Sequence, residues 1–537
     1  MKIPTRAAIA GAASAAVALG VGELLGGVLP GAPSPIAAVG ALVIERQPPG
    51  AKDLMVALFG ESDKAAFEVI IAGASIILGA ILGVVALRWL WVAQAGFVAF
   101  GVLGFVAALD DPLVTSFLAG ATLVAAIAAG LITLRALLPM ARPTTAPTTA
   151  ASEAGLSASR PGIAWPQDDA PGSTEPPGPT KPSSATRRRF LVLSGSAFGL
   201  ALVSAVGGRY LAARRPSPVA TAPVPPASEM VPTPPAGAAF DVPGLTPLVV
   251  PNDDFYRIDT QLTTPHVDAD TWRLRVHGMV EREVELTYEQ LVAMPLIERY
   301  VTIACVSNEV GGDLVGNAKW TGVPLQDVLD LARVKEGATQ IVGRAFDGWT
   351  CGFPTAHGGP DGQEGMIAVK MNDEPLPAPH GFPARLIVPG LYGYVSATKW
   401  LTEIELTTLE AFDAYWVPLG WAKEAPIKTQ SRIDVPRGGS RVPAGNTVVA
   451  GVAWAPDRGI AGVEVSVDEG PWQPAVLSRA ISEDTWVQWR FDWDSSAGEH
   501  RIRCRATDAT GATQTEERRP PAPDGATGYH EIRVNVG

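Results

Sequence analysis

The sequence contains few cysteines and histidines, and this scarcity excludes several kinds of cofactor site. Its 537 residues include 3 Cys and 6 His, and the first histidine is His266. No C-x-x-C pair is present, so zinc and iron–sulfur sites with that spacing are excluded, and three cysteines are too few for a disulfide framework. The C-x-x-C-H motif of covalently attached haem is also absent.

Charged residues are scarce as well. They make up 18% of the chain, while 47% is hydrophobic, and the mean hydropathy is +0.18. Soluble proteins carry about 25% charged residues, so part of this chain is expected to lie in lipid. The net charge of −12 argues against a nucleic-acid partner, because nothing would balance the phosphates. At about 150 residues per domain, the length predicts three or four units.

Long apolar runs dominate residues 1–139, which we interpret as a four-helix transmembrane unit. A run of about 20 apolar residues crosses a bilayer core of about 30 Å. The stretch 36–44 is too short to cross and is expected to be interfacial or re-entrant. The predicted spans are residues 7–29, 66–87, 89–109 and 113–137.

The distribution of charge predicts the orientation of this unit, because cytoplasmic loops carry an excess of Lys and Arg. Cationic residues flank the spans on one side, and Asp110 and Asp111 mark the other, so both ends of the unit are expected in the cytoplasm. The spans contain no histidine, which excludes a b-type haem held by two imidazoles. The cationic residues are Lys2, Arg6, Arg88, Arg135 and Arg142.

Two Pro-rich segments flank a fifth apolar run. Residues 140–186 are predicted to be a disordered cytoplasmic linker, and residues 212–240 a stiff tether. Between them, residues 187–211 read as a fifth span that starts with an arginine cluster, "TRRRFLVLSGSAFGL". This pattern is typical of a twin-arginine export signal, and an ordinary stop-transfer helix remains the alternative. Either way, the rest of the chain is expected outside the cytoplasmic membrane.

The remaining sequence has the composition of folded soluble domains. Residues 241–425 mix alternating strand patterns ("WRLRVHGMV", "REVELTYEQL") with an amphipathic helix ("GVPLQDVLDLA"), which predicts an α+β domain. Residues 426–537 contain about seven short strands between turns, which predicts an immunoglobulin-like β-sandwich. The predicted fold class is therefore multi-domain: all-α transmembrane helices, an α+β domain and this sandwich.

Three motifs in the folded part belong together. "VTIACVSNEVGG" places Cys305 at the end of an apolar strand, "PNDDFYRIDT" offers an Asn, aromatic rings and Arg257, and "HGFPARLIVPGLYGYVSATKWL" supplies cations and tyrosines. Together they resemble the sulfite-oxidase family of molybdopterin enzymes, over about residues 248–537. The C-terminal sandwich resembles that family's dimerisation domain, which implies a homodimer. The first 240 residues look like the membrane extension of an actinobacterial-type branch.

The resemblance implies one molybdopterin, whose dithiolene holds molybdenum together with the Cys305 thiolate, a soft donor suited to this metal. His380, Arg385 and Lys399 match the family's phosphate ligands, and Arg257 aligns with an arginine that borders the substrate anion. Tyr415 falls where the family often keeps an active-site tyrosine, so Cys305, Arg257 and Tyr415 are the predicted catalytic residues. The predicted cofactor-binding residues are Asn252, Tyr256, Arg257, Ser307, Asn308, His357, His380, Arg385, Tyr394, Ser396 and Lys399.

Several of these residues have plain structural alternatives. His357 can be an ordinary loop histidine, and Tyr415 rests on a loose alignment. Cys351 and Cys504 lack the motif that surrounds Cys305 and are expected to be structural, with a disulfide between them left open. The tryptophans near 486–493 are expected in the sandwich core.

The resemblance implies oxygen-atom transfer to a small oxyanion such as sulfite, with two electrons passing to a separate carrier: a cytochrome, a quinone or a membrane partner. Where sulfite oxidases carry arginines after the cysteine turn, this chain reads Asn308-Glu309-Val310, which weakens attraction for a dianion, although Arg257 and Arg344 can compensate. Reduction of an S-oxide or N-oxide is therefore the first alternative. The others are a non-catalytic membrane-anchored binding protein and a hydrolase with a cysteine nucleophile.

Overall fold

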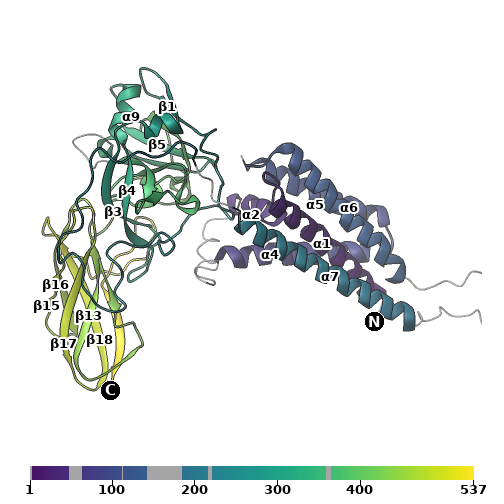
Figure 1. Cartoon of the computed structure of the whole chain (residues 1–537). Coiled ribbons are helices and arrows are strands. Elements are labelled where there is room, and N and C mark those ends of the chain that lie inside the picture. The colour runs from purple at the N-terminus through teal and green to yellow at the C-terminus, as the bar shows by residue number, and fades with distance from the viewer. Residues whose placement is uncertain are drawn as a thin grey trace, which may run out of the picture. The chain divides into compact units, whose positions relative to one another are not determined.

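The computed structural model describes residues 3–46, 58, 63–111, 113–141, 184–215, 220–358 and 365–537. It divides into two compact units, Met1–Arg215 and Pro216–Gly537, which we describe separately (Figure 1). Most of the predicted 140–186 linker lies outside the described residues.

The first unit is helical. Five of its helices are long and apolar enough to cross a membrane, and they coincide with the five predicted spans to within a few residues at most ends. The stretch 36–44 forms a short helix that begins after Ser34, whose hydroxyl accepts a hydrogen bond from the N–H of Ala37. The helices are α1 (Ile3–Val28), α2 (Pro35–Glu45), α4 (Asp63–Val85), α5 (Leu90–Leu109), α6 (Ser116–Ala141) and α7 (Ser184–Ala213).

Helix α1 packs against α4, α6 and α7. Small residues allow close contact, as is usual between membrane helices: a Cβ added to Gly11 would lie 2.1 Å from the carbonyl oxygen of Gly79 on α4, and one added to Gly27 would lie 2.0 Å from that of Gly208 on α7. Residue numbers along α1 rise as those of the contacted residues on α4 fall, so these two helices are antiparallel. The numbers on α1 and α7 rise together, so these two are parallel.

The two ends of this helix bundle differ in charge. Ala7, Ala86 and Phe190 belong to one buried cluster, so Arg6, Arg88 and the arginines of α7 that precede Phe190 gather at one end. At the other end, Arg209 forms ion pairs with Glu23 and Glu68. This asymmetry matches the predicted distribution of positive charge, whereas the side of the membrane that each end faces stays a prediction.

The second unit starts with two sheets. One has the order β2-β1-β10-β5-β6 and the other β3-β4-β7-β8 with β9 added to β7; in the first sheet β1 and β10 are parallel. Their strands are β1 (Arg273–Gly278), β2 (Val284–Thr287), β3 (Ile297–Ala304), β4 (Val315–Pro324), β5 (Gln340–Ala345), β6 (Thr350–Pro354), β7 (Met366–Met371), β8 (Glu374–Pro375), β9 (Arg385–Ile387) and β10 (Leu401–Thr407).

The helices of this part are short: α8 (Tyr288–Val292), α9 (Leu325–Ala332), α10 (Gly393–Ser396), and the 3-10 turns η2 (Thr355–His357), η3 (Ala378–His380) and η4 (Val417–Leu419). Helix α9 confirms the amphipathic helix prediction. The prediction of one continuous strand over "REVELTYEQL" was wrong, because β2 ends at Thr287 and α8 begins there. A capping box between Thr287 and Gln290 starts this helix.

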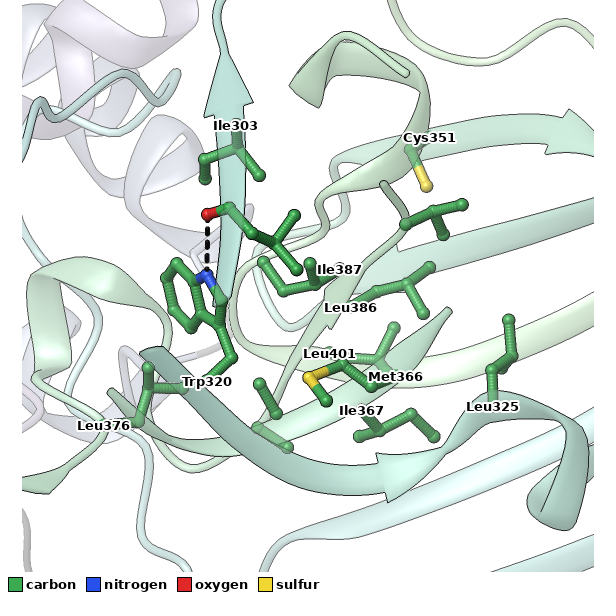
Figure 2. Close-up of a cluster of buried hydrophobic side chains, with 14 of the residues drawn as sticks. Ile303, Trp320, Leu325, Cys351, Met366, Ile367, Leu376, Leu386, Ile387 and Leu401 are labelled. Atoms are coloured by element: carbon green, nitrogen blue, oxygen red, sulfur yellow. Dashed lines mark hydrogen bonds between the residues drawn. The ribbon is translucent and has the colours of Figure 1, made fainter. Parts of the chain in front are cut away.

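Both sheets contribute to one buried core (Figure 2). Ile303, Leu386 and Leu401 are fully or nearly fully buried in it, and the Trp320 indole N–H donates a hydrogen bond to the carbonyl oxygen of Val301 at 3.4 Å. Trp486 also belongs to this core rather than to that of the C-terminal sheets, since its indole N–H donates to the carbonyl oxygen of Leu248 at 2.8 Å. The expectation that the tryptophans of 486–493 share one core was therefore wrong for Trp486.

Two further sheets form the C-terminal part, with the orders β11-β13-β17-β16 and β12-β19-β18-β14-β15. They share a second core that includes Val449 and Trp489 from the first sheet and Val465, Cys504 and Val534 from the other. The immunoglobulin-like topology stays a prediction. The strands are β11 (Gln430–Val435), β12 (Arg441–Val442), β13 (Gly445–Trp454), β14 (Ile460–Val467), β15 (Gln473–Pro474), β16 (Val476–Leu477), β17 (Val487–Ser495), β18 (Gly498–Asp508) and β19 (His530–Val536).

The described part of the predicted tether, residues 220–240, lies against the folded unit. The Ser228 N–H donates to the carbonyl oxygen of Leu296 at 2.9 Å, and Glu229 forms a β-bridge with Ile297. Ala222 and Val224 pack on the core. Over residues 220–240, both the backbone and the side chains contact the folded unit, so this segment is not a separate spacer. The tether prediction was therefore wrong for these residues.

Candidate functional site

Cys305 follows the last residue of β3 and is buried. Its N–H donates to the carbonyl oxygen of Leu314 at 2.9 Å, and the Asn308 N–H donates to the Cys305 carbonyl oxygen at 3.0 Å. The Asn308 side-chain oxygen in turn accepts from the Leu314 N–H at 2.9 Å. Asn308 therefore shapes the turn that presents the thiol, while Ser307 is exposed at its tip.

The C-terminal sheets support this 305–314 loop. Arg432 on β11 donates through Nη1 to the carbonyl oxygen of Gly312 at 2.8 Å, and its Nε is 2.7 Å from Asp434. Gly311 has φ +83°, and a Cβ there would lie 2.2 Å from the imidazole of His530 on β19. The loop therefore needs glycine at this position, because both the backbone conformation and the neighbouring ring exclude a side chain.

Two tyrosines, the half-buried Tyr256 and the buried Tyr392, lie in the electrostatic field of Cys305. Burial raises the pKa of Tyr256 and of Tyr392, and a negative charge on the Cys305 sulfur raises both further. The Tyr392 hydroxyl also receives a hydrogen bond from the backbone N–H of Lys428. Both phenols therefore stay protonated near the thiol. Sequence reasoning selected Tyr256 but left Tyr392 out of the predicted site, although Tyr392 stands in the motif that contains His380, Arg385 and Lys399.

Arg385 is a buried cation that forms no ion pair with any residue that the structure describes. It lies at the start of β9, is 4% exposed, and its guanidinium carbon is 5.0 Å from the centre of the Trp320 ring. Nη1 donates to the carbonyl oxygen of His380 at 3.0 Å, but Nε has no hydrogen-bond partner within the described residues. Burial lowers the pKa of Arg385 to about 10.

His380 is held in its neutral form. Burial, and then the positive charges of Arg385, Lys399 and Arg257, lower the pKa of His380 to about 4. Nε2 lies 2.8 Å from the carbonyl oxygen of Asn252, which can only accept, so Nε2 carries the proton and Nδ1 has a lone pair. The Asn252 amide is occupied by Met371, Glu374 and Asn372, so this residue positions the histidine.

A third cation, Lys399, shares one carboxylate with Arg257. Lys399 Nζ is 2.7 Å from Asp259 Oδ2, and Arg257 Nε is 2.9 Å from the same oxygen. Burial lowers the pKa of Lys399 to about 8, and the positive charge of Arg385 contributes, while Asp259 opposes the shift. Sequence reasoning missed Asp259, although its position two residues after Arg257 was a usable signal.

The other predicted site residues have local roles in the structure. The Tyr394 hydroxyl donates to the carbonyl oxygen of Ala422 at 2.5 Å, and that of Ser396 bonds to carbonyl oxygens of its own turn. His357 ends η2 and is half-buried. The Tyr415 N–H donates to the Thr350 hydroxyl at 3.0 Å, and its ring packs against Trp416.

Cys351 and Cys504 are free thiols, so the disulfide left open between them does not form. Each is fully buried, Cys351 beside the Thr398 hydroxyl at 2.9 Å and Cys504 beside the Ser431 hydroxyl at 3.3 Å. Burial raises the pKa of Cys351 to about 11 and that of Cys504 to about 12. Inert buried thiols of this kind are structural.

The donor set fits an anionic cofactor that brings its own metal ligands. Within the described ranges, no group of three or more His, Cys, Asp or Glu side chains could hold a metal ion, so the protein would contribute a single thiolate. The unsatisfied Nε of buried Arg385, with Lys399 and His380 beside it, suits a phosphate, because a buried cation is costly until an anion pairs with it.

Comparison with known proteins identifies the family of this domain. Residues 261–416 match the model of the oxidoreductase molybdopterin binding domain. Human mitochondrial sulfite oxidase is 28% identical over 308 residues, covering 48% of this chain and 56% of the human protein, so the chain spans about half the length of the sulfite oxidases it matches.

Oxidoreductase YuiH of Bacillus subtilis (strain 168) is 35% identical over 156 residues, which cover 29% of this chain and 74% of YuiH. Among solved structures, sulfane dehydrogenase SoxCD from Paracoccus pantotrophus is 23% identical with a TM-score of 0.47, covering 55% of this chain and 84% of its own. The matched domain and the identity to YuiH establish that this chain belongs to the sulfite-oxidase family of molybdopterin-dependent oxidoreductases.

Proposed function

We propose that the protein is a membrane-anchored molybdenum oxidoreductase that transfers an oxygen atom to or from a small substrate. The five long apolar helices anchor it in the cytoplasmic membrane, and the second unit acts on the extracytoplasmic side. Two electrons are exchanged with a separate carrier in each turnover. A homodimer through the C-terminal sheets belongs to the same proposal.

One observation carries the proposal: the buried Cys305 thiol and the buried Arg385 guanidinium, whose Nε has no hydrogen-bond partner among the described residues, both lie within electrostatic range of Tyr256. The pKa of Tyr256 responds to both Cys305 and Arg385. A protein core rarely retains a cation without a counterion. A bound cofactor explains both groups: its metal would be bound by the Cys305 sulfur, and its phosphate by the Arg385 guanidinium.

In this proposal the chain's own residues bind and orient. Cys305 ligates the metal, and Arg385 and Lys399 donate hydrogen bonds to the phosphate. His380 can accept one through Nδ1, because Asn252 fixes its tautomer. Tyr256 and Tyr392 keep their hydroxyl protons and so place neutral aromatic side chains near the thiol. When bound, the cofactor supplies oxygen-atom exchange and two-electron redox chemistry.

The charges near the predicted substrate arginines favour a second candidate reaction, reduction of a neutral S-oxide or N-oxide. Arg257 is paired with Asp259, and Arg344 with Glu405, with Nε at 3.0 Å. Glu309 adds a negative charge to the loop after Cys305. A site whose cations are already neutralised attracts a dianion such as sulfite less strongly than a neutral oxide.

Metal content tests the main proposal. The full chain is made in a host that synthesises the molybdenum cofactor, beside Cys305→Ala and, as a matched control, Cys504→Ala. We expect about one molybdenum per chain in the wild type and the control, measured by mass spectrometry, and loss in Cys305→Ala. Folded wild-type protein without molybdenum would overturn the proposal and favour a non-catalytic binding protein instead.

Substrate assays on the loaded protein then separate the two reactions. Sulfite oxidation with ferricyanide as acceptor is compared with reduction of a dialkyl sulfoxide by reduced methyl viologen. The higher kcat/KM identifies the reaction class. If both are absent from a molybdenum-loaded protein, small oxyanions and S-oxides are excluded as substrates.

A further inference from the structure

The first unit contains a partly open cavity of about 880 Å³, its mouth included, bordered by α1, α2, α4, α5 and α6. Its lining is almost entirely apolar and includes three phenylalanines of α5: Phe97, Phe100 and Phe105. Four of the bordering helices are long and apolar enough to cross a membrane, so a ligand here would be lipid-soluble.

One buried hydroxyl in this lining lacks a partner. Thr122 on α6 is 2% exposed, and its Oγ1 makes no hydrogen bond to any described residue. Two comparable hydroxyls are satisfied: Ser75, also in the lining, donates to Ile71 at 2.8 Å, and Thr133 on α6 donates to Ala129 at 2.8 Å. Because an unsatisfied buried donor is costly, Thr122 indicates a ligand that carries an acceptor into an otherwise apolar space.

A buried carboxylate fixes the wall at one end of the cavity. Glu23 Oε1 accepts hydrogen bonds from the Ser34 hydroxyl at 2.7 Å and from the Ile36 N–H at 3.0 Å, and Oε2 is 3.3 Å from Arg209. Ile36 itself lines the cavity. Ionised side chains inside apolar helices are rare and mark functional sites. The N-terminus of α2 is therefore fixed in place, and with it the part of the cavity wall that Pro35 and Ile36 form.

We propose that this cavity binds the ring of a lipid-soluble quinone, and that this quinone is the electron carrier for the second unit. A quinone combines what the cavity requires: a flat apolar ring that packs against phenylalanines, and carbonyl oxygens that accept from Thr122. An acyl chain of a phospholipid fills apolar space but offers no acceptor there. The redox part of the proposal rests on the proposed function.

The overall reaction balances in the oxidising direction. Water supplies the oxygen atom to the substrate, and two electrons and two protons are released. The quinone takes up both electrons and both protons and becomes the quinol. In the reducing direction the quinol supplies them, and the oxygen atom leaves the substrate as water.

Two substitutions test the cavity, each with a matched control on the same set of helices. Gly104→Leu fills it, because a Cβ at Gly104 meets only Val39, at 4.0 Å; Gly73→Leu is the control, since a Cβ there meets nothing within 4 Å and Gly73 is not in the lining. Thr122→Val removes the hydroxyl without changing its shape, and Thr133→Val is the control.

The full chain is reconstituted in phospholipid nanodiscs and labelled with an azido-benzoquinone that carries a short alkyl tail. Labelled peptides are mapped by mass spectrometry, with competition by the unmodified quinone. We expect the label on α5 and α6, at least about tenfold less in Gly104→Leu, and about two- to tenfold weaker binding in Thr122→Val, the value of one hydrogen bond. Both controls should bind like the wild type.

Labelling that is absent, that maps to other helices, or that is unchanged in both test variants would overturn the inference. A tightly bound phospholipid that excess quinone does not displace would do the same. Ferricyanide, which accepts electrons directly from a soluble domain, separates this failure from failure of the proposed function. Activity with ferricyanide but without quinone binding overturns only the inference. Quinone binding in a protein without molybdenum overturns the proposed function and, with it, the redox part of the inference, while the binding site stands.

Discussion

Lys399 and Asp259 form a buried ion pair, with Nζ 2.7 Å from Oδ2, although 140 residues separate them in the chain. Asp259 also pairs with Arg257, so one carboxylate fixes two of the cations that the sequence motifs offered. Lys399 and Arg257 are therefore neutralised by Asp259, whereas Arg385 forms no ion pair within the described residues and remains able to bind an anion.

Asp259→Asn should destabilise the second unit strongly. Breaking a buried pair by removing one partner costs about 3–5 kcal/mol of unfolding free energy, because Lys399 would remain as an uncompensated buried charge. Denaturant unfolding of the full chain in detergent, followed by tryptophan fluorescence, measures the change. Asp330→Asn, at an exposed position, is the control and should change stability by less than about 0.5 kcal/mol. Equal effects of the two substitutions would contradict the pairing.

Acid should destabilise the cofactor-free protein through His380. The folded-state pKa of about 4 lies below the ordinary histidine value of 6.5, so the unfolded state binds more protons between these two values. Stability is therefore lost as the pH falls through that window. The shift corresponds to about 3 kcal/mol. His380→Gln should make the unfolding free energy flatter between pH 6.5 and 4.

His500→Gln gives the opposite comparison. The hydrogen bond to Asp468 raises the pKa of this half-buried histidine, so its contribution to stability is present at low pH and is lost as the pH rises through the folded-state value. Its removal should not flatten the acid limb. If His380→Gln and His500→Gln give the same pH profile, His380 does not have the depressed pKa.

Arg385→Met should stabilise the cofactor-free protein while abolishing cofactor retention. Replacing a buried charge by an apolar side chain of similar length removes a desolvation cost, and gains of about 1–4 kcal/mol are typical. Unfolding of cofactor-free protein and molybdenum content of protein from a cofactor-producing host are the two measurements. Arg333→Met, on the surface, should alter neither. A destabilised Arg385→Met protein would mean that the guanidinium already has an anionic partner.

Arg432→Lys should lower molybdenum occupancy without contacting the cofactor. Lysine keeps the charge near Asp434 but cannot hold Asp434, Gly312 and Thr246 at once, as the planar guanidinium does. The 305–314 loop should then loosen, and hydrogen exchange at the amides of Cys305 and Leu314 should become faster. Unchanged exchange together with full molybdenum occupancy would show that the C-terminal sheets do not support the loop.

Features that depend on neighbours in sequence could be predicted. Hydropathy located the five long helices, the apolar run before Cys305 indicated a strand that ends there, and one motif contained His380, Arg385 and Lys399. The capping box that starts α8 is also a local signal in the sequence. It was missed because the alternation of apolar and polar residues around it indicated a strand. These signals are local, since each needs only a window of a few residues to about twenty.

The remainder depends on contacts between distant segments. Nothing near Arg385 in sequence shows that Trp320 lies beneath it or that no carboxylate does, because sheet pairing between β4, β7 and β9 creates that environment. The position of Trp486 in the core of the first two sheets has the same origin. Propensity and patterning cannot supply such contacts, since they carry no information on which strands meet.

The support of the Cys305 loop by Arg432 and His530 has a consequence for biogenesis. Both residues belong to strands made late, β11 and β19, so the thiol cannot be presented correctly while the ribosome is still producing the C-terminal sheets. We therefore expect cofactor insertion to be post-translational, and we expect a truncated product to stay empty. Cofactor loading would then depend on synthesis and folding of the C-terminal sheets.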